Sequence, residues 1–383
     1  MEQSVKDILA DDFWIMPATP EYIDKGVPYI TSKNIKNGTI DFSKVNYISQ
    51  EDYEYISKNR PILVGDILIS MIGTLGETAE VKETDGLFYG QNMFLVRIDE
   101  SKVNKRYFLN FFKSNCVKRA LKGKQNQSTQ KYLKANHIED LIIPVPDVTK
   151  QELIAKQLDK LTYIITLRTN ELKQLDDLIK ARFVELFGDP RSNPFGFEKK
   201  RLKDTCKVIT GNTPSRAIEE YYGDYIEWIK TDNIVSGILN PTQATESLSE
   251  KGMNVGRTVE KDSILMACIA GSIASIGRVC ITDRTVAFNQ QINAVVPEQY
   301  NILFLYVLFQ MSKDYLVEDI NMALKGILSK SKLEEKEFII PPMDLQEQFS
   351  DFVKQVDKSK VAVQKALDET QMLFDSLMQE YFN

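Results

Sequence analysis

The feature that most constrains this chain is an internal repeat. The segment Val27–Asp41 (VPYITSKNIKNGTID) aligns without a gap with Ile226–Asn240 (IEWIKTDNIVSGILN), and this alignment pairs Asn34 with Asn233. Further blocks match in the same order along the rest of the chain. Such a repeat predicts two copies of one structural unit, so the fold should contain two globular modules of the same architecture.

The later blocks mark the ends of the modules. Each module is predicted to end in an Ile-Ile-Pro stop that precedes a long helix, because proline does not continue the preceding element. The matching blocks are Tyr89-Gly-Gln-Asn with Phe288-Asn-Gln-Gln, Ala120-Leu-Lys-Gly with Ala323-Leu-Lys-Gly, and Leu141–Glu152 with Phe338–Phe349, the last pairing Pro144 with Pro341 and Gln151 with Gln348.

Each module is followed by a heptad stripe. After Pro146, and again after Pro341, apolar residues recur at alternating steps of three and four, which is the a/d pattern of a coiled coil. Some seam positions carry a polar residue, such as Arg168 or Lys360. The predicted seam residues are Leu158, Leu161, Ile165, Leu172, Leu175, Ile179, Val356, Val363, Leu367, Phe374 and Leu377.

The two stripes most simply bury each other in an antiparallel pair. A helix of roughly 35 residues spans on the order of 50 Å, so the pair would hold the modules at opposite ends with pseudo-twofold symmetry. In the alternative arrangement, each helix packs only on its own module. The first helix should end near Gly188, since Pro190 follows it. The predicted segments are a first module at 1–146, a helix at 147–190, a second module at 191–342 and a helix at 343–383.

Composition agrees with two buried cores and with the α/β class, built here from α+β modules. The chain has 383 residues with 43% apolar content. The start of the chain lacks a signal-peptide pattern, and the apolar stretch Ile264–Gly277 is too short to cross a bilayer. The four cysteines show no paired spacing and there is one histidine, His137, which argues against structural zinc and for reduced thiols. We therefore expect a soluble, cytoplasmic protein.

Charge is distributed unevenly although the net charge is −6. The segment Ser101–Lys134 contains ten basic residues and no acidic residue, a composition that favours contact with a polyanion. In the alternative interpretation, acidic residues elsewhere, such as those of the 50–54 segment, balance these charges in space. The second module has a weaker basic excess, so the two modules need not bind equally.

The sequence lacks the motifs of common catalytic sites. It contains neither a dinucleotide-binding glycine pattern nor a P-loop with its lysine. The acidic residues Asp147 and Glu171 are about 36 Å apart along one helix, too far to share a metal ion. We predict no catalytic residue, no metal site and no cofactor bound by this chain.

Polar side chains at repeated positions point instead to recognition. The Gly211–Arg216 turn offers hydroxyl and guanidinium donors, and the polar loop after the basic stretch offers amides that can pair with adenine, although it could be a plain solvent loop. Nearby Trp228 fits a core position as well as a ligand contact. The candidate DNA-binding residues are Lys33, Asn34, Gln91, Lys118, Arg119, Lys122, Lys124, Gln125, Asn126, Gln127, Thr213, Ser215, Arg216, Lys230, Asn233, Gln290 and Lys325.

Taken together, these motifs resemble the specificity subunit of type I restriction–modification systems. The resemblance covers the whole chain and rests on the proline motifs that begin at Ile143 and Ile340, on the Gly211–Arg216 turn, and on the Glu185-Leu-Phe-Gly-Asp-Pro helix end. The first module departs from this pattern, since it has Ala18-Thr-Pro20 where the second has Gly-Asn-Thr-Pro-Ser-Arg.

The resemblance implies a non-catalytic subunit with two tandem target-recognition domains. Such a subunit reads a bipartite, asymmetric target in double-stranded DNA, with half-sites about one helical turn, roughly 34 Å, apart. It binds two adenine methyltransferase subunits through its helices and positions motor-nuclease subunits, while S-adenosylmethionine, ATP and Mg are expected on those partners. The alternatives are a recognition subunit of another restriction type, a two-module scaffold that binds proteins, and an enzyme with degenerate motifs.

Overall fold

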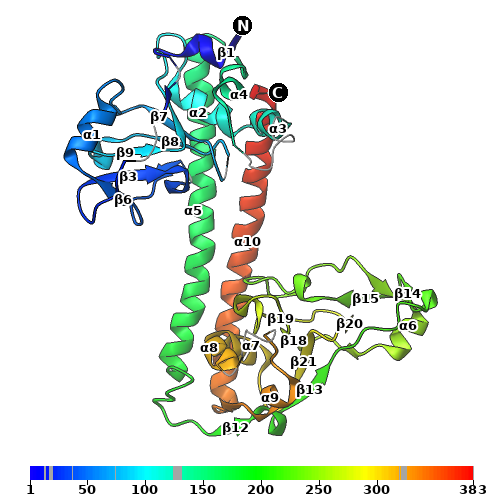
Figure 1. The fold of residues 1–383 in the computed structure, drawn as a ribbon. Helices are drawn as coiled ribbons and strands as arrows, with labels where there is room; N and C mark the ends of the chain where they lie inside the picture. The colour runs from blue at the N-terminus through cyan, green and yellow to red at the C-terminus, as the bar shows by residue number, and fades with distance from the viewer. Residues whose placement is uncertain are drawn as a thin grey trace. The chain divides into compact units, whose positions relative to one another are not determined.

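The computed structural model describes residues 1–12, 14–16, 20–36, 38–73, 75–123, 132–318, 320 and 326–382. The chain divides into two compact units. Unit 1 comprises Met1–Arg168 with Ala366–Asn383, and unit 2 comprises Thr169–Lys365. Each unit therefore contains one globular module together with parts of both long helices, α5 (Val148–Phe187) and α10 (Met343–Phe382) (Figure 1).

Unit 1 is built on two sheets and the helices that cover them. The inner sheet has the order β2-β10-β7-β8, and the outer sheet has the order β6-β3-β9 with β3 and β9 parallel. The inner strands are β2 (Trp14–Ile15), β7 (Ile67–Ser70), β8 (Thr78–Glu80) and β10 (Met93–Val96), and the outer strands are β3 (Val27–Thr31), β6 (Asn46–Ile48) and β9 (Tyr89–Gln91). The short strands β4 (Ile35–Lys36) and β5 (Thr39–Ile40) form a hairpin, and β1 (Glu2–Ser4) pairs with β11 (Ile142–Pro144).

Unit 2 repeats this arrangement. Its inner sheet has the order β13-β21-β18-β19, and its outer sheet has the order β14-β16-β15-β20-β17 with β15 and β20 parallel. The inner strands are β13 (Cys206–Thr210), β18 (Ile264–Ala267), β19 (Val279–Ile281) and β21 (Ile292–Pro297). The outer strands are β14 (Tyr222–Gly223), β15 (Ile226–Ile229), β16 (Ser247–Leu248), β17 (Thr258–Val259) and β20 (Val286–Phe288), and β12 (Lys199–Arg201) pairs with β22 (Glu337–Ile339).

The remaining helices are short. Unit 1 contains α1 (Gln50–Ser57), α2 (Lys105–Lys113), α3 (Asn115–Gly123) and α4 (Ala135–Glu139), and unit 2 contains α6 (Glu250–Val255), α7 (Ile302–Met311), α8 (Lys313–Val317) and α9 (Lys330–Glu335). Asn104 and Asn301 cap the N-termini of α2 and α7 through their side-chain oxygens. These side chains satisfy backbone donors that a helix start otherwise leaves without partners.

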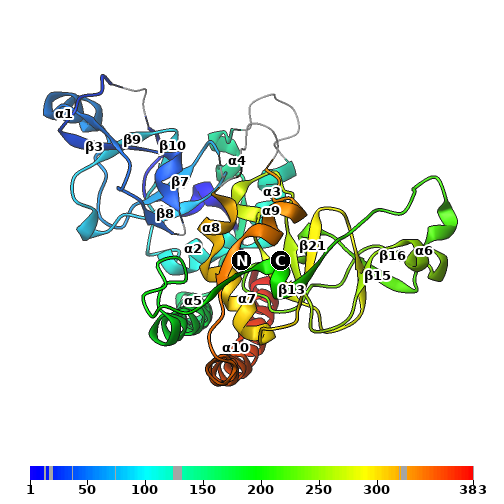
Figure 2. The same ribbon diagram turned by 90° about the horizontal axis from the view of Figure 1, so that it is seen from below.

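Side chains that alternate along the inner strands contribute to two layers of the core, one against the helices and one between the two sheets. In β7, Ile67 and Ile69 pack with the helices, whereas Leu68 packs between the inner and outer sheets. In β18, Ile264 and Leu265 divide in the same way. Successive side chains of a strand point to opposite faces, so a fully apolar strand serves both layers. Figures 1 and 2 show that in each unit the outer sheet lies farther from the long helices than the inner sheet does.

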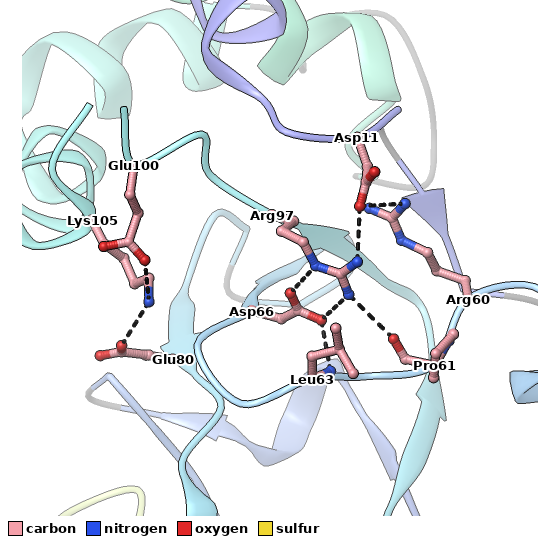
Figure 3. Close-up of polar contacts among 9 residues, drawn as sticks. All are labelled: Asp11, Arg60, Pro61, Leu63, Asp66, Glu80, Arg97, Glu100 and Lys105. Carbon is pink, nitrogen blue, oxygen red and sulfur yellow. Dashed lines mark hydrogen bonds and ion pairs between the residues drawn. The ribbon is translucent and has the colours of Figure 1, made fainter. Parts of the chain in front are cut away.

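An ion-pair network fixes the loop before β7 in unit 1. The carboxylate of Asp66, which is 1% exposed, accepts two hydrogen bonds from Arg97, at 2.7 and 2.8 Å, and Arg97 also contacts Asp11 at 2.8 Å (Figure 3). Asp11 in turn pairs with Arg60 at 3.1 Å. The hydrogen bonds to the Asp66 carboxylate raise the pKa of Arg97. A buried charge requires such a partner, so the network has a structural role.

The long helices pair antiparallel, and this pairing is visible within each unit. In unit 1, Phe382 near the end of α10 packs against Tyr107 of α2, with ring centroids 5.1 Å apart, and joins the core that contains Leu158 of α5. In unit 2, Phe183 near the end of α5 packs against Phe349 near the start of α10, at 5.6 Å. Each helix therefore contributes to both cores, which excludes the alternative that each packs only on its own module.

The predicted seam residues are all buried or half-buried, and polar side chains bond across the seam. Arg168 of α5 donates to the carbonyl oxygen of Ala366 and to the hydroxyl of Thr370 in α10. In unit 2, Lys360 of α10 pairs with Asp176 of α5 at 2.7 Å. Gly188 ends α5 with φ +70°, and its N–H donates to the carbonyl of Val184, so the predicted helix end is confirmed.

The structure corrects one block of the predicted repeat. In the pair of β1 with β11, Ile143 lies opposite Gln3, and in the equivalent pair of β12 with β22, Phe338 lies opposite Lys200. Ile143 is therefore equivalent to Phe338 and not to Ile340, so the alignment of this block is wrong by two residues. Matching letters in the proline-rich segment produce the error, whereas strand pairing fixes the true register.

Candidate nucleic-acid interface

The Gly211–Arg216 turn of unit 2 is held by its own backbone and by Asn212. A Cβ on Gly211 would lie 2.2 Å from the carbonyl oxygen of Asn289, so only glycine fits there. The Asn212 side chain donates to the carbonyl of Val255 at 2.9 Å and accepts from the N–H of Arg257 at 2.8 Å. The turn is therefore fixed against the outer sheet, and its last residues present their side chains to solvent.

Predicted residues from distant parts of the sequence meet beside this turn. The hydroxyl of Thr213 donates to the side chain of Gln290, and both residues are exposed. Arg216 and Lys230 both pair with Glu246, the first at 2.6 Å. We call the residues Thr213, Arg216, Lys230, Glu246 and Gln290 the second-module polar cluster.

Aromatic rings support the cations of this cluster. The Arg216 guanidinium lies 4.5 Å from the ring centroid of Tyr222 and 5.3 Å from that of Trp228, and the Lys230 ammonium lies 5.2 Å from the latter. Cations are attracted to the faces of such rings. Trp228 is 3% exposed and its indole N–H donates to the carbonyl of Asn212, so of its two possible roles the structure supports the core position.

The electrostatics of the cluster centre on Glu246. Its pKa is lowered, first through the hydrogen bond from Lys230 and also through Arg216, with burial acting in the opposite direction. Glu246 is thus ionised at neutral pH and shares its charge between two cations. Sequence reasoning missed this residue, because a single acidic residue in a polar segment carries no pattern.

The corresponding place in unit 1 holds an aromatic pair and a glutamine. Gln91, at the end of β9, donates to the hydroxyl of Tyr22 at 3.2 Å, and the rings of Tyr22 and Tyr29 are 6.1 Å apart. Burial raises the pKa of Tyr29. Lys33 lies nearby in sequence and is exposed. Among the described residues, Gln91 thus bonds to a tyrosine hydroxyl, whereas its counterpart Gln290 in the second-module polar cluster accepts from Thr213. The sequence did not predict Tyr22.

The structure assigns a structural role to Asn34 and Asn233, two of the predicted DNA-binding residues. The Asn34 amide donates to the carbonyls of Asp41 and Lys44, at 2.8 and 3.0 Å, and its oxygen accepts from the N–H of Thr31. Asn233 bonds in the same manner to Thr242, Gln243 and Lys230. Both residues are buried, 8% and 7% exposed, and both amide protons are used. These bonds occupy both amide protons in each residue, so they support a structural role, and a contact with a base edge stays a prediction.

The basic stretch of unit 1 divides into a paired part and an exposed part. Lys102, Lys105 and Arg106 lie within ion-pair distance of Asp99, Glu100 and Asp159, respectively. Figure 3 also shows Lys105 between Glu80 and Glu100. The acids that balance this part are therefore these, and not those of the 50–54 segment.

The exposed part lies on α3. Lys118, Arg119 and Lys122 follow one another at helical spacing on its solvent side, and the side chain of Arg119 donates back to the carbonyl of Asn115 at 3.3 Å. Together with Asn115 and Gln379, these residues line a hollow of about 350 Å³. We call Lys118, Arg119 and Lys122 the α3 basic face.

Ser215 is the remaining predicted residue of the Gly211–Arg216 turn. Ser215 is exposed, and its carbonyl accepts from the N–H of Ile218. Lys124, Gln125, Asn126, Gln127 and Lys325 lie outside the described residues. Among the described residues, no group of three or more His, Cys, Asp and Glu side chains is arranged to hold a metal ion. No helix in the described ranges is long and apolar enough to span a bilayer.

Comparison with known proteins gives one consistent family. The family model for the type I restriction modification DNA specificity domain matches twice, at residues 15–177 and 194–370. The HindI specificity subunit of Haemophilus influenzae is 31% identical over 41% of this chain and 35% of its own length. The MjaIX specificity subunit of Methanocaldococcus jannaschii is 25% identical over 94% of this chain and 86% of its own length.

Solved structures show the same fold. The S subunit of a type I restriction-modification system from M. genitalium has a TM-score of 0.60 at 13% identity, with 100% of this chain and 96% of that chain covered. A chain from a study of assembly and conformational transition in a type I system has a TM-score of 0.58 at 16% identity, with coverage of 100% and 97%.

The family model spans both halves of the chain and repeats in tandem, as the two structural units do. The chain therefore belongs to the type I restriction–modification DNA specificity family, whose members are specificity subunits without catalytic activity of their own.

Proposed function

We propose that this chain reads DNA sequence for a type I restriction–modification complex, with each unit recognising one half of a split, asymmetric target in double-stranded DNA. The observation that carries this proposal is the contrast between equivalent sites on one repeated fold. Both sites hold a glutamine, Gln91 or Gln290. Unit 2 adds two cations that pair with a carboxylate and lie over aromatic rings, whereas Gln91 of unit 1 bonds to the hydroxyl of Tyr22. A common fold with different side chains suits the reading of two different half-sites.

The α3 basic face is proposed to add to the affinity of unit 1 for DNA. Its residues are exposed, and they carry no base-specific geometry of their own. Lysine and arginine in such a setting neutralise phosphates, which gives affinity without sequence preference. We therefore assign the α3 basic face to the DNA backbone and the outer-sheet residues to the bases.

The test is a selection from random-sequence duplexes by the full chain together with its methyltransferase subunits. The proposal expects a bipartite consensus, and exchange of residues 27–134 for those of a relative should change one half-site only. Change of both half-sites would contradict the assignment of one unit to each half. Absence of sequence preference, with affinity that does not depend on salt, would favour a scaffold that binds proteins.

The outer faces of the long helices support the proposed binding of two methyltransferase subunits. Tyr163 and Leu167 of α5 are adjacent at helical spacing and are 64% and 48% exposed. Exposed apolar side chains of this kind mark protein contacts when they gather in a patch. On this proposal, S-adenosylmethionine, ATP and Mg belong to the partner subunits, including the motor nuclease.

Binding of the methyltransferase subunits can be tested with matched variants. The pair Tyr163→Ala and Leu167→Ala should weaken assembly with the methyltransferase subunit in a pull-down and in analytical ultracentrifugation. The matched control is the pair Tyr55→Ala and Leu63→Ala, which removes the same exposed residue types from unit 1 outside α5 and α10. Equal assembly by both variants would show that this patch does not bind the partner.

A further inference from the structure

Glu246 lies at the centre of the second-module polar cluster and contacts both of its cations. One carboxylate oxygen accepts from Arg216 at 2.6 Å, and the other accepts from Lys230. The side chain of Arg216 is 57% exposed and that of Glu246 is 34% exposed, so solvent and ligands reach the pair. The two oxygens of one carboxylate thus pair with two cations on a face that we assign to DNA.

The carboxylate is not required to position these cations. Arg216 already stacks on the rings of Tyr222 and Trp228, and Lys230 lies over the same indole. The rings are themselves fixed, because Tyr222 donates its hydroxyl proton to the carbonyl of Pro214 at 2.6 Å. An exposed ion pair also adds little to stability, typically about 0 to 1 kcal/mol.

A carboxylate and a DNA phosphate each offer a pair of anionic oxygens that can accept from a guanidinium or an ammonium group. We propose that Glu246 is an internal competitor for DNA phosphate, which holds Arg216 and Lys230 in the free protein and must release them when DNA binds. This inference rests on the proposed function and adds to it the residue that suppresses binding to wrong sequences.

The consequence is a penalty that depends on what DNA offers in return. Non-specific DNA provides only phosphates, which would replace one anion with another and leave Glu246 repelled by the backbone. A correct half-site also provides base contacts, which compensate for the exchange. A repulsive element of this kind increases the ratio of specific to non-specific affinity.

The experiment compares the full chain with its Glu246→Gln variant on a random-sequence duplex over a range of salt concentrations. The variant should bind several-fold more tightly, and its plot of log K against log salt should be steeper by about 0.9 for each additional phosphate that its freed cations neutralise. The double variant Arg216→Gln with Glu246→Gln should lose this increase in affinity. Thermal unfolding of each chain checks that the fold is intact.

Glu335 provides a matched control in the same unit. It also lies between a lysine and an arginine, Lys203 and Arg201, and it has no aromatic ring or predicted DNA residue among its described ion-pair partners. Glu335→Gln makes the same change in net charge as Glu246→Gln. Because Glu335 lies outside the second-module polar cluster, its replacement should leave DNA affinity and its salt dependence unchanged.

The outcomes separate the inference from the proposed function. Wild-type binding with no tighter binding by Glu246→Gln, or equally tighter binding by Glu335→Gln, would overturn the inference alone. A loss of affinity in Glu246→Gln would also overturn it, since the carboxylate would then orient the cations for DNA. Absence of DNA binding by every chain, with or without the methyltransferase subunit, would overturn both.

Discussion

Gln151 and Gln346 share two equivalent side-chain hydrogen bonds in the two units. The Gln151 oxygen accepts from the N–H of Asn104 at 2.8 Å, and the Gln346 oxygen accepts from the N–H of Asn301 at 2.9 Å. The amide of each donates at 2.8 Å to a proline carbonyl, Pro146 in unit 1 and Pro341 in unit 2. Each glutamine thus ties the start of a long helix to the cap of a short one.

Gln346→Ala should therefore destabilise the protein. The change leaves the part-buried N–H of Asn301 and the buried carbonyl of Pro341 without their side-chain partner, which costs about 1–3 kcal/mol. Gln348→Ala is the matched control, since Gln348 is exposed and is the residue that the sequence alignment pairs with Gln151. Chemical denaturation should show a loss for the first variant and a change within about 0.5 kcal/mol for the second. Equal losses would contradict the corrected register.

Asn233→Ala should destabilise unit 2 without altering which bases it prefers. The side chain donates to the hydroxyl of Thr242 and to the carbonyl of Gln243, and it accepts from the N–H of Lys230. Its loss leaves these part-buried groups without that partner, at a cost of about 1–3 kcal/mol. Asn254→Ala, at an exposed position of α6, is the control. Thermal unfolding measures the first effect, and target selection below the transition temperature measures the second. A changed consensus in the folded variant would restore Asn233 to the DNA-contacting set.

Neutralising the α3 basic face should weaken binding to all sequences alike. The pair Lys118→Gln and Lys122→Gln removes two exposed charges, so the slope of log K against log salt should become shallower by about 1.8, that is, about 0.9 for each phosphate no longer neutralised. The pair Lys102→Gln and Lys105→Gln is the control, because both lysines already have carboxylate partners. If the control has the larger effect, the assignment of phosphate binding to α3 is wrong.

Thiol reactivity should distinguish Cys116 from the other cysteines. Burial raises the pKa of Cys206, Cys268 and Cys280 to about 12 in each case, so their reactive thiolate forms are scarce at about pH 8. Cys116 is half-buried on α3. Iodoacetamide should add once to the native chain and to all four cysteines after denaturation, as counted by mass spectrometry. Rapid labelling of Cys268 in the native protein would indicate that the unit 2 core opens.

The repeat and the heptad stripes are sufficient to predict the architecture. Periodic apolar positions report burial directly, so the seam from Leu158 onwards can be recognised without a structure. The roles of polar residues cannot be recognised in this way. An asparagine that bonds to backbone groups and an asparagine that contacts a base look the same in the sequence. Asn34 and Asn233 repeat because the fold needs them, whereas Glu246, which sits among predicted residues, has no counterpart in any sequence pattern.

The seam contacts predict how the long helices tolerate insertion. Arg168 and Asp176 of α5 bond to Thr370 and Lys360 of α10, respectively. A heptad inserted after Leu172 separates the two α5 residues while their partners stay in place, so one of these bonds must break and the seam must slip. A second heptad inserted after Val363 of α10 lengthens the opposite helix of the pair and restores both bonds. We expect the single insertion to lower the unfolding temperature or to abolish assembly. The double insertion should recover assembly, and target selection should then show a longer spacing between the half-sites. If the single insertion retains both stability and spacing, the pairing of α5 with α10 does not set the register.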